Sequence, residues 1–286
     1  MTKRRSAKKW LTLPGVIWMI GFTVIPLIMI AIYAFTGSDG SFTWSNLAAI
    51  TTPENVKALL LSLKLSLICT VVCIVLAYPL ALILKSRSLS RSSFIVFIFV
   101  LPMWMNFLLR TYAWQTLLEK NGVINGILNT LHLPNINIIN TESAIVLGMV
   151  YNFLPFMVLP IYNVLVKIDD NVINAAKDLG ANSVQTFAKI IFPMSLPGVV
   201  SGITMVFVPA LTTFVVSDLL GGAKILLIGN VIEHKFTTEF NWNVGSGLSL
   251  VLMIFILLCM AFLNFVDKDG EVTALGKRSL NNFIWR

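Results

Sequence analysis

The stretch NAAKDLGANSVQTFAKIIFP, residues 174–193, lies between two long apolar runs of the chain. It carries too many charged and polar side chains to cross a bilayer. Its alanine, leucine, valine and phenylalanine residues nevertheless make it too apolar for an ordinary solvated loop. We therefore expect this segment to pack against another surface.

The composition of the whole chain places it in a membrane. Only 12% of the 286 residues are charged and 57% are hydrophobic, whereas a soluble domain carries about 25% charged residues. One protein core cannot hide that much apolar surface. The chain is predicted to be an all-α integral membrane protein.

Six segments contain the roughly 20 mostly apolar residues that a spanning helix needs. They are residues 13–35, 59–84, 93–114, 143–166, 197–217 and 246–266. The first run is longer than the apolar part of a signal peptide, so we expect it to be a retained helix. The predicted parts are a basic tail over 1–12, a six-span transmembrane domain over 13–266 and a C-terminal tail over 267–286.

The positions of lysine and arginine give the orientation. With the N-terminus in the cytoplasm, 15 of these residues fall inside and 6 outside, as the positive-inside rule expects. Both termini are then cytoplasmic. The same asymmetry explains the net charge of +8 without nucleic acid, since no basic patch is interleaved with aromatic residues.

The segment over about 167–196 is predicted to lie on the cytoplasmic side as two short helices. Asp170 or Asn171 is predicted to cap a helix that runs to Leu179, because apolar residues share one face. Gly180 ends it, and a second helix, capped by Asn182 or Ser183, follows. Pro193 predicts another break before the next span. The segment's partner is a lipid headgroup layer, the protein's own inner surface or a groove on a soluble partner.

The spacing A-A-x-x-x-G, nine residues, then I-x-x-P resembles the EAA loop of binding-protein-dependent ABC importer permeases. Ala175, Ala176, Gly180, Ile190 and Pro193 match that pattern, and Asp178 occupies a variable position. Two positions depart from it, because Asn174 stands where glutamate is usual and Phe192 where leucine is usual. The resemblance implies the type I ABC importer permease fold and a loop that couples this subunit to an ATPase.

Three other stretches resemble the spermidine/putrescine permeases of the PotB type. They are LPMWMNFLLRTYAW (101–114), GMVYNFLPFMVLPIY (148–162) and VSDLLGGAKILLIGNVI (216–232). The resemblance implies import of polyamines by alternating access. It also implies four kinds of partner: a PotC-like second permease, a PotA-like ATPase dimer that uses ATP and magnesium, a PotD-like binding protein and the lipid bilayer.

A cation's path through the membrane needs carboxylates, aromatic faces and carbonyl oxygens. Asp218 is the acidic residue nearest to membrane depth and is a candidate for that path, although it could equally pair with Lys224 or cap a turn. The other candidates are Trp104, Asn106, Tyr151 and Asn152, each of which could instead anchor a helix.

The chain lacks the features of an enzyme. GGAK over 221–224 departs from the phosphate-loop pattern G-x(4)-G-K-[ST], and no nucleophile lies in a pattern with a base. We expect no catalytic residue, no metal site and no cofactor in this chain. Two alternative functions remain open. The first is an ABC importer permease of the same architecture for another small solute, such as thiosulfate or iron. The second is a membrane enzyme or carrier that works without an ATPase.

Overall fold

The computed structural model describes residues 14–86 and 101–284. The basic tail and the first part of the predicted third span lie outside these residues. The described chain is helical, apart from loops and one isolated bridge between Thr36 and Phe42. In chain order the helices are η1 (Ile20–Val24), α2 (Ile25–Ala34), α3 (Ser45–Ala48), η2 (Ala49–Thr51), α4 (Pro53–Ser86), η4 (Leu101–Trp104), α6 (Phe107–Leu118), α7 (Val123–Thr130), α8 (Glu142–Leu165), α9 (Asp170–Asp178), α10 (Ser183–Thr186), η5 (Phe187–Ile191), α11 (Phe192–Thr212), α12 (Val215–Leu220), α13 (Ile228–Thr237) and α14 (Trp242–Ile284).

Five helices in the described residues are long and apolar enough to cross a membrane. They cover Pro14–Ala34, Pro53–Lys85, Glu142–Leu165, Ser183–Thr212 and Trp242–Leu263. These agree with five of the six predicted spans. The described part of the predicted third span is not one continuous helix, because η4 ends at Trp104 and α6 begins only at Phe107.

The chain divides into two compact units. The first consists of residues 1–57 and 231–256, and the second of residues 58–230 and 257–286. In the first unit, α2 is followed by a loop and α3, which packs on the start of α14. The contact is close, since a Cβ added at Gly247 would lie 2.4 Å from the carbonyl oxygen of Asn46.

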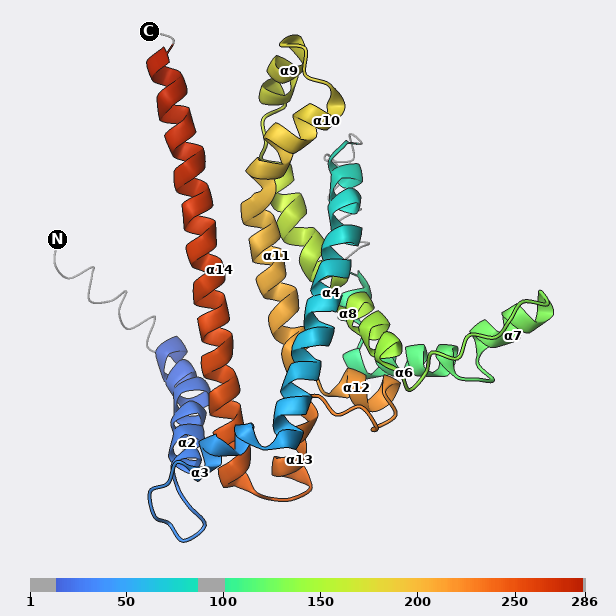
Figure 1. The fold of residues 1–286 in the computed structure, drawn as a ribbon, viewed down its shortest axis with the longest axis vertical. Helices are drawn as coiled ribbons and strands as arrows, with labels where there is room; N and C mark the ends of the chain where they lie inside the picture. Colours follow the sequence, from blue (N-terminus) through green and yellow to red (C-terminus); the bar gives the residue numbers. More distant parts are fainter. Residues whose placement is uncertain (1–13, 87–100, 285–286) are drawn as a thin grey trace, which may run out of the picture. The chain divides into compact units, whose positions relative to one another are not determined.

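In the second unit, α8 and α11 lie side by side and form the centre of the core (Figure 1). Small residues allow this approach: a Cβ at Gly198 would lie 2.8 Å from the carbonyl oxygen of Pro160. The inward side chains of α8 are fully buried, among them Ile145, Met149 and Met157. Helix α4 packs beside this pair and contributes Cys69, Cys73 and Ala77 to the same core.

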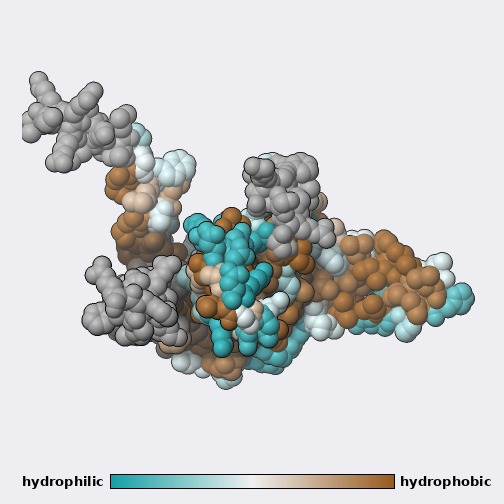
Figure 2. Space-filling model, turned by 90° about the horizontal axis from the view of Figure 1, so that it is seen from above, coloured by the Kyte–Doolittle hydropathy of each residue, from teal (hydrophilic) through white to brown (hydrophobic). Residues whose placement is uncertain are grey.

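Short helices lie at the two ends of this second unit. At one end are α9 and α10, which belong to the segment between α8 and α11, and at the other end is α12 (Figure 1). Viewed from the α9 and α10 end, hydrophilic residues gather over this segment, above hydrophobic helices (Figure 2). The polar segment therefore covers one end of an apolar bundle, as its sequence predicts.

Candidate functional site: the helical loop between α8 and α11

The loop begins with a well-capped short helix. The Asp169 carboxylate accepts a hydrogen bond from the backbone amide of Asn171 at 2.9 Å, so α9 starts one residue earlier than predicted. The predicted caps, Asp170 and Asn171, are its first two residues. A side-chain oxygen at this position satisfies a backbone amide that has no partner within the helix.

Gly180 ends α9 as predicted. Its φ of 85° lies in the left-handed region, which glycine adopts at little cost. The backbone amide of Ala181 donates to the carbonyl of Ala176 at 3.0 Å, and that of Gly180 donates to Lys177 at 2.9 Å. This pair of bonds is a Schellman motif, which fixes the turn between the two arms of the loop.

The second arm starts at Asn182, one of the two predicted caps. Its side chain accepts from the Gln185 amide, and the Gln185 side chain accepts in return from the Asn182 amide, at 2.8 and 3.0 Å. This reciprocal capping box starts a helix of only four residues, α10. The predicted cap at Asn182 is therefore confirmed.

The predicted break at Pro193 is wrong. The helix continues from Ser183 to Thr212 through the π-helical turn η5 and into α11. Pro193 lies just after η5, and the widened π turn shifts the preceding hydrogen bonds so that the helix can accommodate a residue without an N–H. The second arm of the loop and the following span are consequently one helical rod.

Tyr78 of α4 anchors this rod. Its hydroxyl lies 2.5 Å from Ser195 Oγ, and its ring meets Phe187 edge-on, with centroids 5.6 Å apart. The Phe192 ring lies 5.8 Å from that of Tyr78, so the residue that departs from the usual leucine takes part in an aromatic cluster. Sequence reasoning missed Tyr78, whose only signal was a polar aromatic residue within an apolar run.

The first arm is held by a cation at the end of α4. Lys85 Nζ lies 3.4 Å from Asp170 Oδ1 and donates to the carbonyl of Ile168 at 3.4 Å. Ile173 packs against the core, and Ala176 is buried. Both arms therefore contact the helices of their own subunit.

The opposite side of the loop is not covered by other residues in the part of the chain that the structure describes. Leu179 is 89% exposed and Val184 is 74% exposed. These two apolar side chains flank the turn at Gly180. The predicted apolar faces are thus divided: Ala176, Phe187 and Ile191 face inward, while Val172, Ala175, Leu179, Val184 and Ala188 face solvent. Of the other residues predicted to take part in coupling, Asn174, Asp178 and Pro193 are exposed, and Ile190 is half-buried.

The five candidates for a substrate path do not line a common cavity in the part of the chain that the structure describes. Tyr151 lines a mostly apolar cavity of about 540 Å³ with Trp114 and Glu142; the other four candidates are not among its lining residues. Asn106 caps α6, accepting from the amides of Leu108 and Leu109. Trp104 is 71% exposed.

Asn152 is the least explained of these candidates. It is 2% exposed, in the middle of α8, and neither polar atom of its side chain has a hydrogen-bond partner among the described residues. Such an unsatisfied buried amide is costly, so this position is retained as a candidate.

Asp218 is held by an asparagine that sequence reasoning missed. The fully buried Asn230 donates from Nδ2 to Asp218 Oδ1 at 2.5 Å, and its Oδ1 accepts from Ser217 Oγ and the Leu227 amide. The asparagine joins α12 to the start of α13. Its signal was a lone amide in the apolar stretch ILLIGNVI.

Comparison with known proteins agrees with this architecture. Residues 66–268 match the family described as "Binding-protein-dependent transport system inner membrane component". The spermidine/putrescine transport system permease protein PotB of Haemophilus influenzae is 37% identical over 249 residues, covering 84% of this chain and 87% of that protein. PotB of Escherichia coli is 39% identical over 245 residues, covering 83% and 89%.

A solved structure shares the fold. A chain of a bacterial ABC transporter involved in the import of alginate has a TM-score of 0.75 and 18% identity, over 93% of this chain and 96% of that one. The family match covers more than half of the chain, and the loop between α8 and α11 lies within it. The chain therefore belongs to the family of inner membrane components of binding-protein-dependent transport systems.

Proposed function

We propose that this permease subunit imports polyamines and that a separate ATPase drives it through the loop over residues 170–193. The observation that carries the coupling is the exposure of Leu179 and Val184 on a loop that is otherwise capped and anchored. The polyamine assignment rests on the resemblance to PotB proteins of two bacteria.

The anchoring of the loop suits it to transmit motion. Because α10, η5 and α11 form one continuous helix, a displacement of the second arm moves α11 without a hinge at Pro193. Since α11 packs along α8, that displacement reaches the centre of the second unit. ATP binding and hydrolysis, with magnesium, take place in the partner ATPase.

The exposed apolar pair would bind in a groove of the ATPase. Burying a leucine side chain contributes about 1.5–3 kcal/mol, which is enough to position a docking helix. The exposed Asn174 is uncharged, so no ion pair with the ATPase is expected at the position where glutamate is usual.

The assembly that we propose also contains a PotC-like second permease and a PotD-like binding protein that delivers the substrate from outside. The distribution of lysine and arginine supports cytoplasmic termini and a cytoplasmic loop. Asp218, Tyr151, Asn152, Trp104 and Asn106 remain the proposed contributors to the path.

Uptake of radiolabelled putrescine and spermidine tests the cargo. Cells that lack other polyamine uptake systems and express the complete transporter should accumulate both amines, and unlabelled spermidine should compete. A strain without the ATPase gene is the control and should show no uptake. If neither amine enters or competes in the complete strain, the polyamine assignment is overturned.

Cysteine cross-linking tests the coupling. Val184→Cys, in a background without Cys69, Cys73 and Cys259, should form a disulfide with a cysteine in the ATPase groove. Thr130→Cys, an exposed position in α7, should not. Failure of Val184→Cys to cross-link while the complex stays assembled would place the ATPase contact elsewhere.

A further inference from the structure

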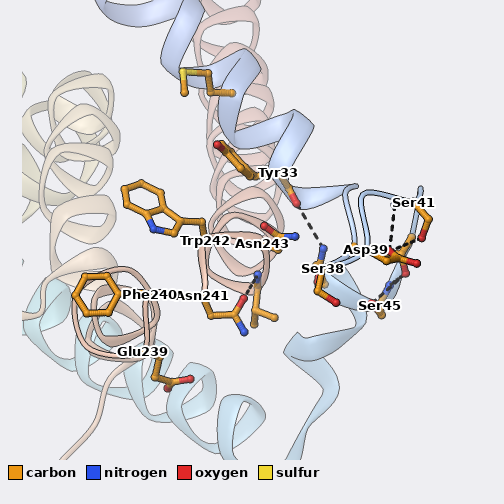
Figure 3. A pocket seen from close by; sticks show the side chains of 15 residues that line it. Tyr33, Ser38, Asp39, Ser41, Ser45, Glu239, Phe240, Asn241, Trp242 and Asn243 are labelled. Carbon is orange, nitrogen blue, oxygen red and sulfur yellow. Dashed lines mark hydrogen bonds between the residues drawn. The ribbon is translucent and has the colours of Figure 1, made fainter.

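A large pocket lies in the first unit, between the loop that follows α2 and the connection from α13 to α14 (Figure 3). Its volume is about 1090 Å³, at the upper end of the range for ligand pockets. Fifteen residues line it. In the orientation proposed above, both loops lie on the outer side of the membrane.

The charge of the lining is opposite to that of the chain. The chain has a net charge of +8, yet the only charged residues in the lining are two carboxylates, Asp39 and Glu239. They come from different loops and lie on different sides of the pocket (Figure 3). Two separated anionic groups suit a ligand with separated positive charges.

Asp39 is held ready as an anion. The Ser41 hydroxyl donates to Asp39 Oδ1 at 2.7 Å and the Ser41 amide donates to the same oxygen at 3.1 Å. These hydrogen bonds lower the pKa of Asp39 below its ordinary value. The side chain therefore stays charged at any pH near neutrality.

Glu239 already binds an ammonium group. Lys235 Nζ lies 2.8 and 2.6 Å from its two oxygens, although Lys235 itself does not line the pocket. A ligand amine would share or replace this lysine. The ion pair is partly exposed, so exchanging one ammonium for another costs little.

Aromatic rings stand beside Glu239. Phe240 is 72% exposed and Trp242 is 54% exposed, and both line the pocket. Phe240 has a φ of 50°, an unfavourable value for a bulky residue. Faces of exposed aromatic rings attract ammonium groups.

Amide groups complete the wall. Asn46 is 6% exposed, and its Nδ2 donates to the carbonyl oxygens of Ala34 and Thr36. This leaves Oδ1 as an acceptor on the side chain. Asn241 and Asn243 lie between the two carboxylates (Figure 3).

From this arrangement we infer that the pocket is a binding site for a linear aliphatic oligoamine, with one amine at Asp39 and another at Glu239, Phe240 and Trp242. The site would hold the cargo on the permease before it enters the membrane. This inference rests on the proposed function and adds a site to it.

Direct binding tests the site. The assembled transporter in lipid nanodiscs, without the soluble binding protein, is titrated with spermidine and binding is followed by calorimetry. The double variant Asp39→Asn/Glu239→Gln should weaken binding by about tenfold or more. Lys235→Gln should strengthen it, because it frees Glu239, and 1,4-butanediol, which is uncharged, should not bind to this pocket.

Glu54→Gln is the matched control, since Glu54 is an exposed carboxylate of the same unit that does not line the pocket. Binding of spermidine to the double variant within twofold of that of Glu54→Gln would overturn the inference. Wild-type uptake separates the two proposals: uptake with unchanged binding in the double variant removes only this site, whereas no polyamine uptake removes the proposed function itself.

Discussion

At the scale of single residues, Gly180 occupies a backbone conformation that most residues adopt only at a cost. No heavy atom lies within 4 Å of a Cβ built there, so the cost comes from φ and not from crowding. The left-handed conformation costs about 1–2 kcal/mol for a residue with a Cβ, and less for asparagine. The two arms of the loop depend on this one turn.

Gly180→Val is therefore expected to reduce polyamine uptake strongly while the protein still inserts in the membrane. Gly180→Asn should keep much of the activity. Uptake and membrane content of the two variants are the measurements. Gly126→Val in α7, where a Cβ also meets no atom within 4 Å, controls for loss of a glycine; equal uptake by Gly180→Val and wild type would contradict the role of the turn.

Asn230 is the second residue on which much depends. Its amide satisfies Ser217, Asp218 and the Leu227 backbone at once. Asn230→Leu should lower the free energy of unfolding by about 2–4 kcal/mol, because it removes the partner of the buried Leu227 amide and one hydrogen bond each of Ser217 and Asp218. Denaturation of the purified permease in detergent measures this change, with the exposed Asn129→Leu as control. A change below about 0.5 kcal/mol would show that the network is not needed for stability.

At the scale of elements, the contact between α8 and α11 depends on a close backbone approach. A Cβ at Gly198 would meet Pro160 O at 2.8 Å and the Ile161 Cα at 3.1 Å, and backbone atoms cannot move aside easily. Gly198→Ala should cost about 1–3 kcal/mol. Gly202→Ala should cost less, because its nearest neighbour is the flexible Met157 side chain.

Thermal denaturation of the two glycine variants tests this order. Gly126→Ala, with open space around the new methyl group, should be as stable as wild type or more so. Equal melting temperatures for Gly198→Ala and Gly126→Ala would show that the close approach of α8 and α11 at Gly198 does not contribute to stability.

The rod from Ser183 to Thr212 gives a prediction about stiffness. Replacing Ala188 and Lys189 with glycine should soften η5, since glycine costs about 0.5–1 kcal/mol at each helical position. We expect uptake to fall while the ATPase still co-purifies. Lys189→Ala, which removes the charge but keeps the helix, should transport normally; normal transport by the double glycine variant would rule out the rod as a lever.

The helices of this loop were easier to predict from the sequence than the residues of other helices that they contact. Gly180 acts through its own backbone conformation, and the Asn182 side chain caps an amide three residues along the chain, so both roles were predictable from residue type. Which apolar residues of the loop face inward depends on Tyr78 and Lys85 of α4, more than 80 residues away, and no local pattern contains that information. The break at Pro193 was predicted wrongly because a proline near a helix start is tolerated when a π turn precedes it.

At the scale of the whole molecule, the distribution of lysine and arginine predicts the membrane topology. In membranes stripped of the ATPase, Val184→Cys should react with a membrane-impermeant maleimide only when the cytoplasmic side is open, and Thr130→Cys should react in intact spheroplasts. Variants without the native cysteines provide the background. Labelling of both positions from the same side would contradict the six-span topology.

The spans themselves were predictable from composition, since lipid tolerates no other long structures. The interruption between Trp104 and Phe107 was not predicted, because Asn106 takes a capping role that hydropathy does not register. The substrate path was the least predictable part. Its candidates were chosen by residue type, but the side chains of Asn106 and Asp218 form hydrogen bonds with nearby groups of this chain.

The exposure of Leu179 and Val184 also bears on the life of the chain before assembly. A newly made copy without its ATPase carries two bare apolar side chains beside a tight turn, a surface of the kind that chaperones and membrane proteases recognise in unassembled subunits. We expect such orphan copies to be degraded, so that the cellular amount of this protein follows the supply of its partner. The residues that pass on the energy of ATP would then also regulate the stoichiometry of the complex.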